Sequence, residues 1–342
     1  MKKLITYSCV LLLSQFMLLT AQAGVTPAFM TPLASKSLLT DIVEVGDSVV
    51  AVGDRGHIVY STDGDNWQQA KVPVNVLLTD VFFLDQNHGW AVGHDATILA
   101  SVDGGKSWTV QQSAPEIDKP LFGIHFKDSS NGIAFGAYGM FYRTTDGGAS
   151  WQDEFHGELL HPDDLAYIND LKANDPKGYK DETATILPHF NRLMTLGSTL
   201  YLVGETGMVA KSDDFGAHWN KAEPFYNGSF FTIDNGGTGG IFVGGLRGNL
   251  FYSHDFGQKD APGSWKKLAL AATTSINRIF SAVDKMVIVG NSGLFYTSHD
   301  GGKTFTSRVQ SDGKAITAGV VKGSKLILTT EAGIKVIQGG KW

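Results

Sequence analysis

The sequence has a single cysteine among its 342 residues, and this residue, Cys9, lies near the amino terminus. The chain therefore cannot form an internal disulfide, and a fold of this length has to rely on its hydrophobic core. Basic residues are also scarce, 28 against 34 acidic ones, and this sign of charge disfavours bulk nucleic-acid binding. After residue 23, no apolar run approaches the roughly 18 residues that a membrane-spanning helix needs.

The first 23 residues have the layout of a secretory signal peptide. Lys2 and Lys3 precede an apolar run from Leu4 to Leu19, and Ala21-Gln22-Ala23 forms a small-x-small cleavage site. A lone membrane anchor is the alternative, which the shortness of the apolar run disfavours. We expect residues 1–23 to be removed, which leaves residues 24–342 with a net charge of −8. The mature chain should be a monomer in the periplasm or a secreted protein.

A short motif recurs along the chain and is seen most fully in Ser101-Val102-Asp103-Gly104-Gly105-Lys106-Ser107-Trp108. The Ser hydroxyl and the Asp carboxylate can bond their own backbone, while Gly supplies positive φ. We therefore assign the motif aspartates, often called Asp-box residues, to turn structure rather than to metal binding or catalysis. They are Asp63, Asp103, Asp146, Asp214, Asp255 and Asp300.

The spacing of these aspartates reveals the architecture. Successive intervals lie near 40 residues, except for a longer one between Asp146 and Asp214. Each unit reads as four short strands joined by Gly-containing turns, which is typical of a β-propeller blade. The apparent first strands predict an all-β, seven-bladed propeller, with blades that begin near Leu39, Leu78, Leu121, Asn191, Phe230, Ile276 and Ala315.

Two segments depart from this repeat. The seventh unit has room for only three strands, and we expect residues 25–35 to supply the fourth and so to remove an open sheet edge. Residues 154–190 form an acidic insertion between blades three and four, in which His161-Pro162-Asp163-Asp164 begins a short helix. This insertion should overhang the face that carries the turns between the second and third strands.

Candidate binding residues lie on that same face, which we call the loop face. Its turns carry Arg55, Tyr138, Glu205 and Arg247, and the starts of the inner strands add Arg192 and Arg278 near the axis. Arg192, Arg247 and Arg278 should gather in one sector, opposite the acidic residues Asp41, Asp80 and Asp95. Because guanidinium groups suit carboxylates and peptide groups, we predict that Arg55, Arg192, Arg247, Arg278, Tyr138 and Glu205 bind a partner. Pairing of the arginines with the acidic insertion or with neighbouring loops is the alternative.

The sequence shows no established catalytic or cofactor motif. It lacks a nucleophile elbow, a phosphate-binding glycine loop and a His-Glu-x-x-His metal motif. His156, His161 and His189 lie near acidic residues, but their spacing matches no compact metal site. We therefore predict no cofactor, no metal and no catalytic residue.

The segment Phe83, Asp85, Gly89, Trp90, Val92 and Gly93, followed by Asp-Gly-Gly-x-x-Trp, resembles the photosystem II stability and assembly factor family, a branch of the bacterial neuraminidase repeat propellers. The resemblance extends from about Leu39 to the end of the sequence. It implies a seven-bladed, lumenal or periplasmic propeller that assists membrane protein subunits without chemistry, through an arginine-bearing surface. A photosynthetic source would place the chain in the thylakoid lumen. The chain differs from photosynthetic members in lacking a lipid-attachment cysteine at the cleavage site and in having the insertion.

Two functions of different class follow. The first is an exported scaffold that binds an extracytoplasmic peptide or loop of a membrane protein and helps to assemble its complex. The second is a sialidase-like glycoside hydrolase, with Tyr138 or Glu205 as the nucleophile and Asp41 or Asp80 as the acid. Against the second, sialidases are six-bladed and the sequence lacks a Phe-Arg-Ile-Pro-like signature. A carbohydrate-binding propeller is a further alternative.

Overall fold

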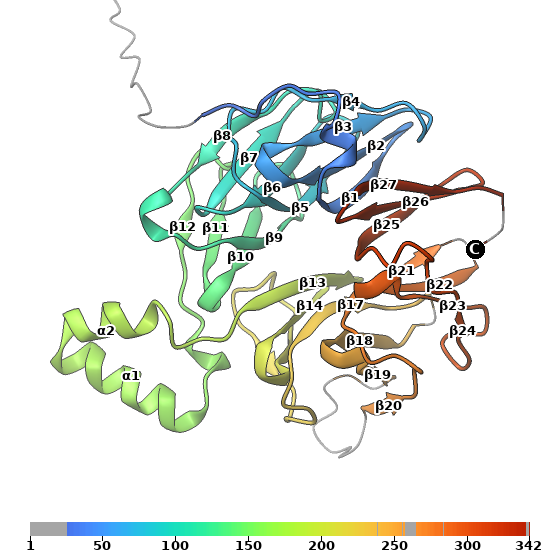
Figure 1. Ribbon diagram of the computed structural model, residues 1–342. Coiled ribbons are helices and arrows are strands. Elements are labelled where there is room, and N and C mark those ends of the chain that lie inside the picture. Colours follow the sequence, from blue (N-terminus) through green and yellow to red (C-terminus); the bar gives the residue numbers. More distant parts are fainter. Residues whose placement is uncertain (1–25, 238, 255, 257–264, 283, 340–341) are drawn as a thin grey trace, which may run out of the picture.

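Seven small antiparallel sheets surround a central axis in the computed structural model, which describes residues 26–342 except 238, 255, 257–264, 283 and 340–341 (Figure 1). The seven-bladed propeller predicted from the motif spacing is therefore confirmed. The expected signal peptide, residues 1–23, and the motif residue Asp255 lie outside the described residues. Within the part of the chain that is described, no helix is long and apolar enough to cross a membrane.

Each blade runs outward from the axis in the order of its strands. The strands are β1 (Leu39–Val45), β2 (Ser48–Gly53), β3 (Ile58–Ser61) and β4 (Gln68–Gln69) in blade one; β5 (Leu78–Phe83), β6 (Gly89–Gly93), β7 (Thr97–Ser101) and β8 (Thr109–Gln112) in blade two; β9 (Leu121–Phe126), β10 (Gly132–Gly136), β11 (Phe141–Thr144) and β12 (Gln152–Asp153) in blade three; β13 (Phe190–Leu196), β14 (Thr199–Gly204), β15 (Val209–Ser212) and β16 (Asn220–Lys221) in blade four; β17 (Phe230–Asp234), β18 (Ile241–Gly245), β19 (Leu250–Ser253) and β20 (Lys266–Leu268) in blade five; β21 (Ile276–Ala282), β22 (Lys285–Gly290), β23 (Phe295–Ser298) and β24 (Thr306–Ser307) in blade six; and β25 (Ile316–Lys322), β26 (Lys325–Thr330) and β27 (Gly333–Ile337) in blade seven.

The motif turns connect the third and fourth strands of a blade and are held by hydrogen bonds within the turn. Asp103 Oδ1 accepts hydrogen bonds from the backbone N–H groups of Lys106 and Ser107, each at 3.0 Å, and Ser101 Oγ accepts one from Gly105 N at 2.9 Å. Trp108 Nε1 donates to the Gly105 carbonyl at 3.0 Å, which fixes the indole over the turn. These bonds are the self-contained turn structure that the Ser-x-Asp-x-Gly pattern favours.

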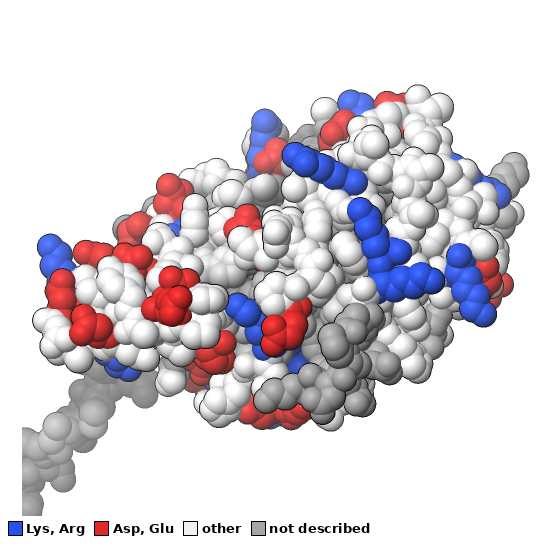
Figure 2. Space-filling view, turned by 90° about the horizontal axis from the view of Figure 1, so that it is seen from below, with Lys and Arg blue, Asp and Glu red and all other residues white. Residues whose placement is uncertain are grey.

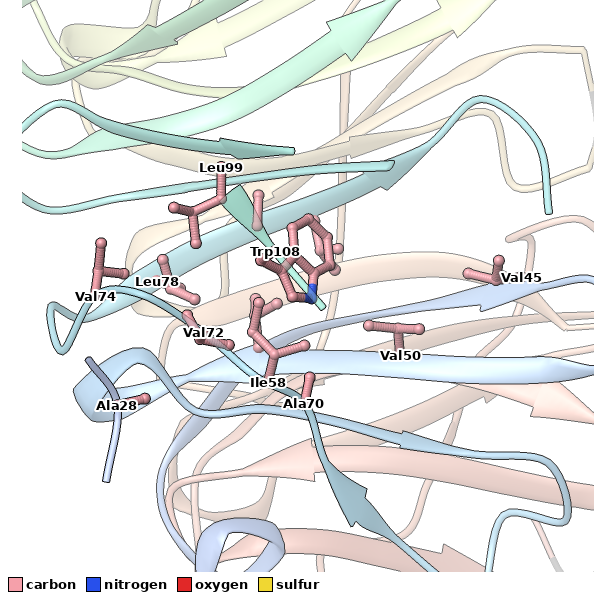
Figure 3. Packing of buried hydrophobic residues seen from close by; sticks show 13 residues of the cluster. Ala28, Val45, Val50, Ile58, Ala70, Val72, Val74, Leu78, Leu99 and Trp108 are labelled. Atoms are coloured by element: carbon pink, nitrogen blue, oxygen red, sulfur yellow. The ribbon is translucent and has the colours of Figure 1, made fainter. Parts of the chain in front are cut away.

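The motif tryptophan also joins neighbouring blades. Figure 3 shows Trp108 among Val50 and Ile58 of blade one and Leu78 and Leu99 of its own blade, and the indole is buried. The second strands between which it packs are buried at nearly every position, because each lies between two other strands and two neighbouring blades. The core of the protein is thus a series of wedges between blades.

Blade seven differs from the predicted closure. Among the described residues its sheet has three strands, and no strand from residues 26–35 pairs with β27. The segment instead runs beside blade one, where Ala28 N donates to the Val72 carbonyl and Thr31 N donates to Gln69 Oε1. Pro27 and Pro32 have no N–H group for a ladder, which favours this irregular path.

Contacts between β1 and β25 close the ring (Figure 1). Thr317 Oγ1 donates to the Leu39 carbonyl at 2.7 Å, and Lys322 Nζ donates to the Asp47 carbonyl at 2.7 Å. Trp342 lies between blades six and seven, in the cluster that includes Val287, Phe295 and Leu328. It occupies the place that Trp108 has between blades one and two, although its blade lacks a motif turn in the sequence.

The insertion between blades three and four contains two helices, where the sequence predicted one. The helices are α1 (Pro162–Asn174) and α2 (Pro176–Thr183), and we call residues 154–190 the helical arm. The predicted start of α1 is observed, with His161 as N-cap and Pro162 in the first turn. The second helix begins because Asp175 Oδ1 accepts from Gly178 N at 3.0 Å and Pro176 follows this cap directly.

Candidate functional site

A pocket opens at the centre of the loop face, and each blade contributes one residue to it. The first strand of every blade has a register shift one residue after its start, as a β-bulge produces, and the shifted residue is aimed at the axis. These residues, together with Arg192 and Arg278, surround a cavity of about 260 Å³. The seven are Thr40, Thr79, Phe122, Asn191, Phe231, Asn277 and Thr317.

Five of the seven bulge residues join their blade to the next one. Thr40, Thr79 and Thr317 donate through Oγ1, and Asn191 and Asn277 donate through Nδ2, each to a backbone carbonyl at the start of the following blade, at 2.6–2.9 Å. Phe122 and Phe231 have no such donor, so the pocket rim is polar except at these two aromatic rings.

Four charged residues form a network below the rim. Arg192 Nη1 donates to Asp80 Oδ1 at 2.6 Å and to Asp41 Oδ2 at 3.4 Å, and Arg278 Nη2 donates to Asp41 Oδ1. Asp41 and Asp80 are 3% and 5% exposed, so their charges are removed from water and depend on the guanidinium groups. Burial raises the pKa of Asp80, and the neighbouring Arg192 opposes that shift.

This network changes the interpretation of the arginine sector. Arg192 and Arg278 do lie together, but they pair with Asp41 and Asp80 across the axis, rather than with the acidic insertion. Arg247 lies apart from this network, exposed on a turn of the loop face. The four paired charges sum to zero, so the central pocket offers N–H donors without a net positive charge.

A histidine on the inner strand of blade three gives the protein a testable pH dependence. Burial lowers the pKa of His125 to about 4, and Thr195 Oγ1 lies 3.2 Å from its Nε2. A ring that titrates near 6.5 when unfolded and near 4 when folded leaves the stability unchanged above pH 6.5 and lowers it as the pH falls from 6.5 towards 4. We expect the free energy of unfolding of His125→Gln to fall by about 1–2 kcal/mol less than that of the wild type between pH 7 and pH 4. The figure is kept small because the ring is partly exposed. Urea unfolding of both proteins at pH 7, 5.5 and 4 measures it, and parallel pH profiles would contradict the assignment.

The turns between second and third strands present a second ring of side chains on the loop face. Arg55, Tyr138, Thr206, Arg247 and Ser292 occupy equivalent positions, and all have left-handed backbone with φ of 54–57°. Each is exposed and is followed by a glycine that packs against a neighbouring segment. Left-handed backbone costs a non-glycine residue roughly 1 kcal/mol, and such strain is common at binding sites.

Tyr138 and Glu205 are brought together by His189 at the junction of blades three and four. Tyr138 N donates to His189 Nδ1 at 3.0 Å, and the two rings meet edge to face at 4.5 Å. Glu205 Oε2 lies 3.5 Å from the same Nδ1 and accepts from His189 N at 3.3 Å. His189 was considered only as a metal ligand in the sequence, and its position next to β13 is the signal that could have placed it here.

The helical arm extends outward from the rim of the disc in Figure 1, so it does not cover the central pocket. Its base contacts the loop face, where Lys119 Nζ donates to the Ala184 carbonyl at 2.6 Å and Leu187 packs beside Gly139. In the described part of the chain, no three His, Cys, Asp or Glu side chains are grouped as metal ligands would be.

The glycosidase hypothesis assigned the acid to Asp41 or Asp80. In this structure both aspartates are buried below the rim and are paired with Arg192 and Arg278. The geometry therefore gives that hypothesis no support.

Comparison with known proteins adds an independent line of observation. The family described as "Photosynthesis system II assembly factor YCF48" matches residues 59–153. The photosystem II assembly protein Ycf48 of Synechococcus sp. (strain JA-3-3Ab) is 48% identical over 48 residues, which span 14% of either chain. The predicted resemblance to this assembly factor family is confirmed.

Solved structures of Ycf48 share the fold over almost the whole chain. One described as "YCF48 bound to D1 peptide" superposes with a TM-score of 0.67 at 16% identity and covers 93% of this chain and 100% of its own. YCF48 from Cyanidioschyzon merolae gives 0.66 at 16% identity, over 94% and 100%. The family match, residues 59–153, extends from blade one to blade three, and the likeness of the whole chain to these structures is one of fold.

Sequence reasoning missed two features of this loop face. The bulges were not predicted, although Leu-Thr-Asp at the start of blades one and two is a repeated signal for them. The left-handed ring was also missed, although a Gly-x-x-Gly pattern precedes the third strand in five blades, as in Gly53–Gly56 and Gly245–Gly248.

Proposed function

We propose that this chain is an exported, non-catalytic propeller that binds an extracytoplasmic segment of a membrane protein and assists the assembly of its complex. The observation that carries the proposal is the shared fold with a Ycf48 structure described as bound to a D1 peptide. We place the chain in the periplasm or outside the cell, or in the thylakoid lumen if its source is photosynthetic.

The loop face is the surface that suits this role. Its central pocket has guanidinium and amide N–H groups around two aromatic rings, and an extended peptide can use both kinds of contact. The ring of left-handed residues adds exposed Arg55 and Arg247. The Arg55 side chain is 78% exposed, and its Nε lies 3.4 Å from the carboxylate of the neighbouring Asp54. Among the described residues Arg247 has no ion-pair partner. Both arginines are exposed to an acidic partner.

The test should remove the exposed arginines of the loop face and leave the buried Arg–Asp network intact. We expect Arg55→Ser/Arg247→Ser to reduce in-cell crosslinking to a membrane partner by about tenfold, because exposed charges contribute to encounter and orientation. The matched control is Lys106→Ser/Lys303→Ser, which removes two exposed cations from motif turns on the opposite face. If both variants capture the partner as the wild type does, the loop face is not the binding surface.

A further inference from the structure

A cleft separates the base of the helical arm from the loop-face edge of blade four. Its volume is about 360 Å³, which lies in the range of ligand-binding cavities. One wall comes from the arm, through residues 159–161, 164 and 185–188, and the other comes from blade four, through residues 205–208, 221, 222 and 224. Tyr138 of blade three lies at one end.

The floor of the cleft is apolar and its rim is acidic. Leu159, Leu187 and Met208 are buried beneath it, so their positions are fixed by packing. Asp164 and Glu205 lie on the rim from opposite walls. In the described part of the chain, Asp164 makes no ion pair or side-chain hydrogen bond, and Glu205 meets only His189.

Lys221 also lines the cleft, and both it and Lys119 bind backbone carbonyls rather than these carboxylates. Lys221 Nζ donates to the Leu159 carbonyl at 2.9 Å, and Lys119 Nζ donates to the Ala184 carbonyl at 2.6 Å. The two helices of the arm carry five acidic residues and three lysines. Figure 2 shows acidic side chains gathered over this end of the molecule. The cleft therefore has a negative field above an apolar floor.

A lysine or arginine side chain is complementary to this arrangement. Its methylene stem can cover Leu159, Leu187 and Met208 while its charged end reaches the rim carboxylates. A charge-assisted hydrogen bond to a carboxylate is roughly twice as strong as a neutral one, and a concave, partly dry site strengthens it. Thr206 and Tyr138, which have left-handed backbone, also line the cleft.

We propose that this cleft binds a lysine- or arginine-bearing segment of the partner protein, next to aliphatic residues of that segment. The inference rests on the proposed function, since it assigns a second contact to the same partner. It divides recognition into a loop face with exposed arginines and an arm cleft with acidic side chains on its rim. A partner segment with both signs of charge would then bind in one orientation only.

A displayed library of random hexapeptides, selected on the immobilised mature chain, tests this inference. We expect enriched sequences to carry Lys or Arg beside Leu, Ile, Val or Met. Selection on Asp164→Asn/Glu205→Gln should reduce that enrichment by about tenfold or more, since both substitutions keep the side-chain shape and remove the charge. No enrichment, enrichment of acidic sequences, or equal enrichment on the double variant would each overturn the inference.

The matched control is Asp181→Asn/Glu182→Gln, which removes the same charge from α2 outside the cleft. It should retain the enrichment of basic peptides. This experiment is separable from the test of the proposed function. If the cleft variant selects peptides normally while Arg55→Ser/Arg247→Ser still loses its membrane partner, only the cleft assignment fails.

Discussion

Arg192→Leu should lower the free energy of unfolding by about 3–5 kcal/mol, the cost of leaving a buried charge without its partner. Asp80 is buried and its Oδ1 receives the 2.6 Å bond from Arg192 Nη1, so the substitution leaves this carboxylate in a poorly hydrated channel. Asp41 would keep Arg278. Urea unfolding followed by tryptophan fluorescence measures the effect, at a pH near neutrality.

A second substitution separates charge from packing. Asp80 Oδ2 also accepts from Ile124 N at 3.1 Å, and an asparagine oxygen can retain that bond. We therefore expect Asp80→Asn/Arg192→Leu to recover most of the loss and to lie within about 2 kcal/mol of the wild type. Arg247→Leu, on an exposed turn, should change the stability by less than about 0.5 kcal/mol. A double variant as unstable as the single one would show that packing of Arg192, and not its charge, is responsible.

The number of blades could be predicted from the sequence because each blade is closed locally. Asp103 bonds backbone groups three and four residues away, so the motif carries its own structure wherever it occurs. The spacing of such motifs therefore predicts the number of blades. The partners of Arg192 could not be predicted in this way, because Asp41 and Asp80 lie 151 and 112 residues earlier in the chain. Only closure of the ring brings them across the axis.

The same distinction explains the errors in the closing blade and the arm. Residues 26–35 were expected to pair with β27. Strand pairing depends on which sheet edge lies near the segment in the folded protein, and the two prolines of this segment have no backbone N–H group to donate. The helix α2 was missed because its sequence, Pro-Lys-Gly-Tyr-Lys-Asp-Glu-Thr, has little apolar periodicity and contains a glycine. The Asp175 cap and the packing of Tyr179 near Phe155 explain why it forms.

Trp342→Ala should destabilise the protein by about 3–5 kcal/mol, the usual cost of deleting a buried tryptophan side chain. Trp342 is 6% exposed and fills the wedge between Val287, Phe295 and Leu328. Lys285 Nζ lies 4.3 Å from the centre of its ring and donates to the Trp342 backbone oxygen at 2.7 Å. Blade seven has no motif turn, so this one side chain supplies the contact that a motif tryptophan gives to blade two.

Two further variants distinguish the sources of this stability. Trp342→Phe keeps an aromatic ring in the wedge and should cost about 1–2 kcal/mol. Lys285→Met keeps the aliphatic stem and removes the cation, so it should cost about 0.5–1 kcal/mol. Urea unfolding of the three variants orders these contributions. If the free energy of unfolding of Trp342→Ala lies within about 1 kcal/mol of the wild-type value, then the contacts between β1 and β25 keep the ring closed without this side chain.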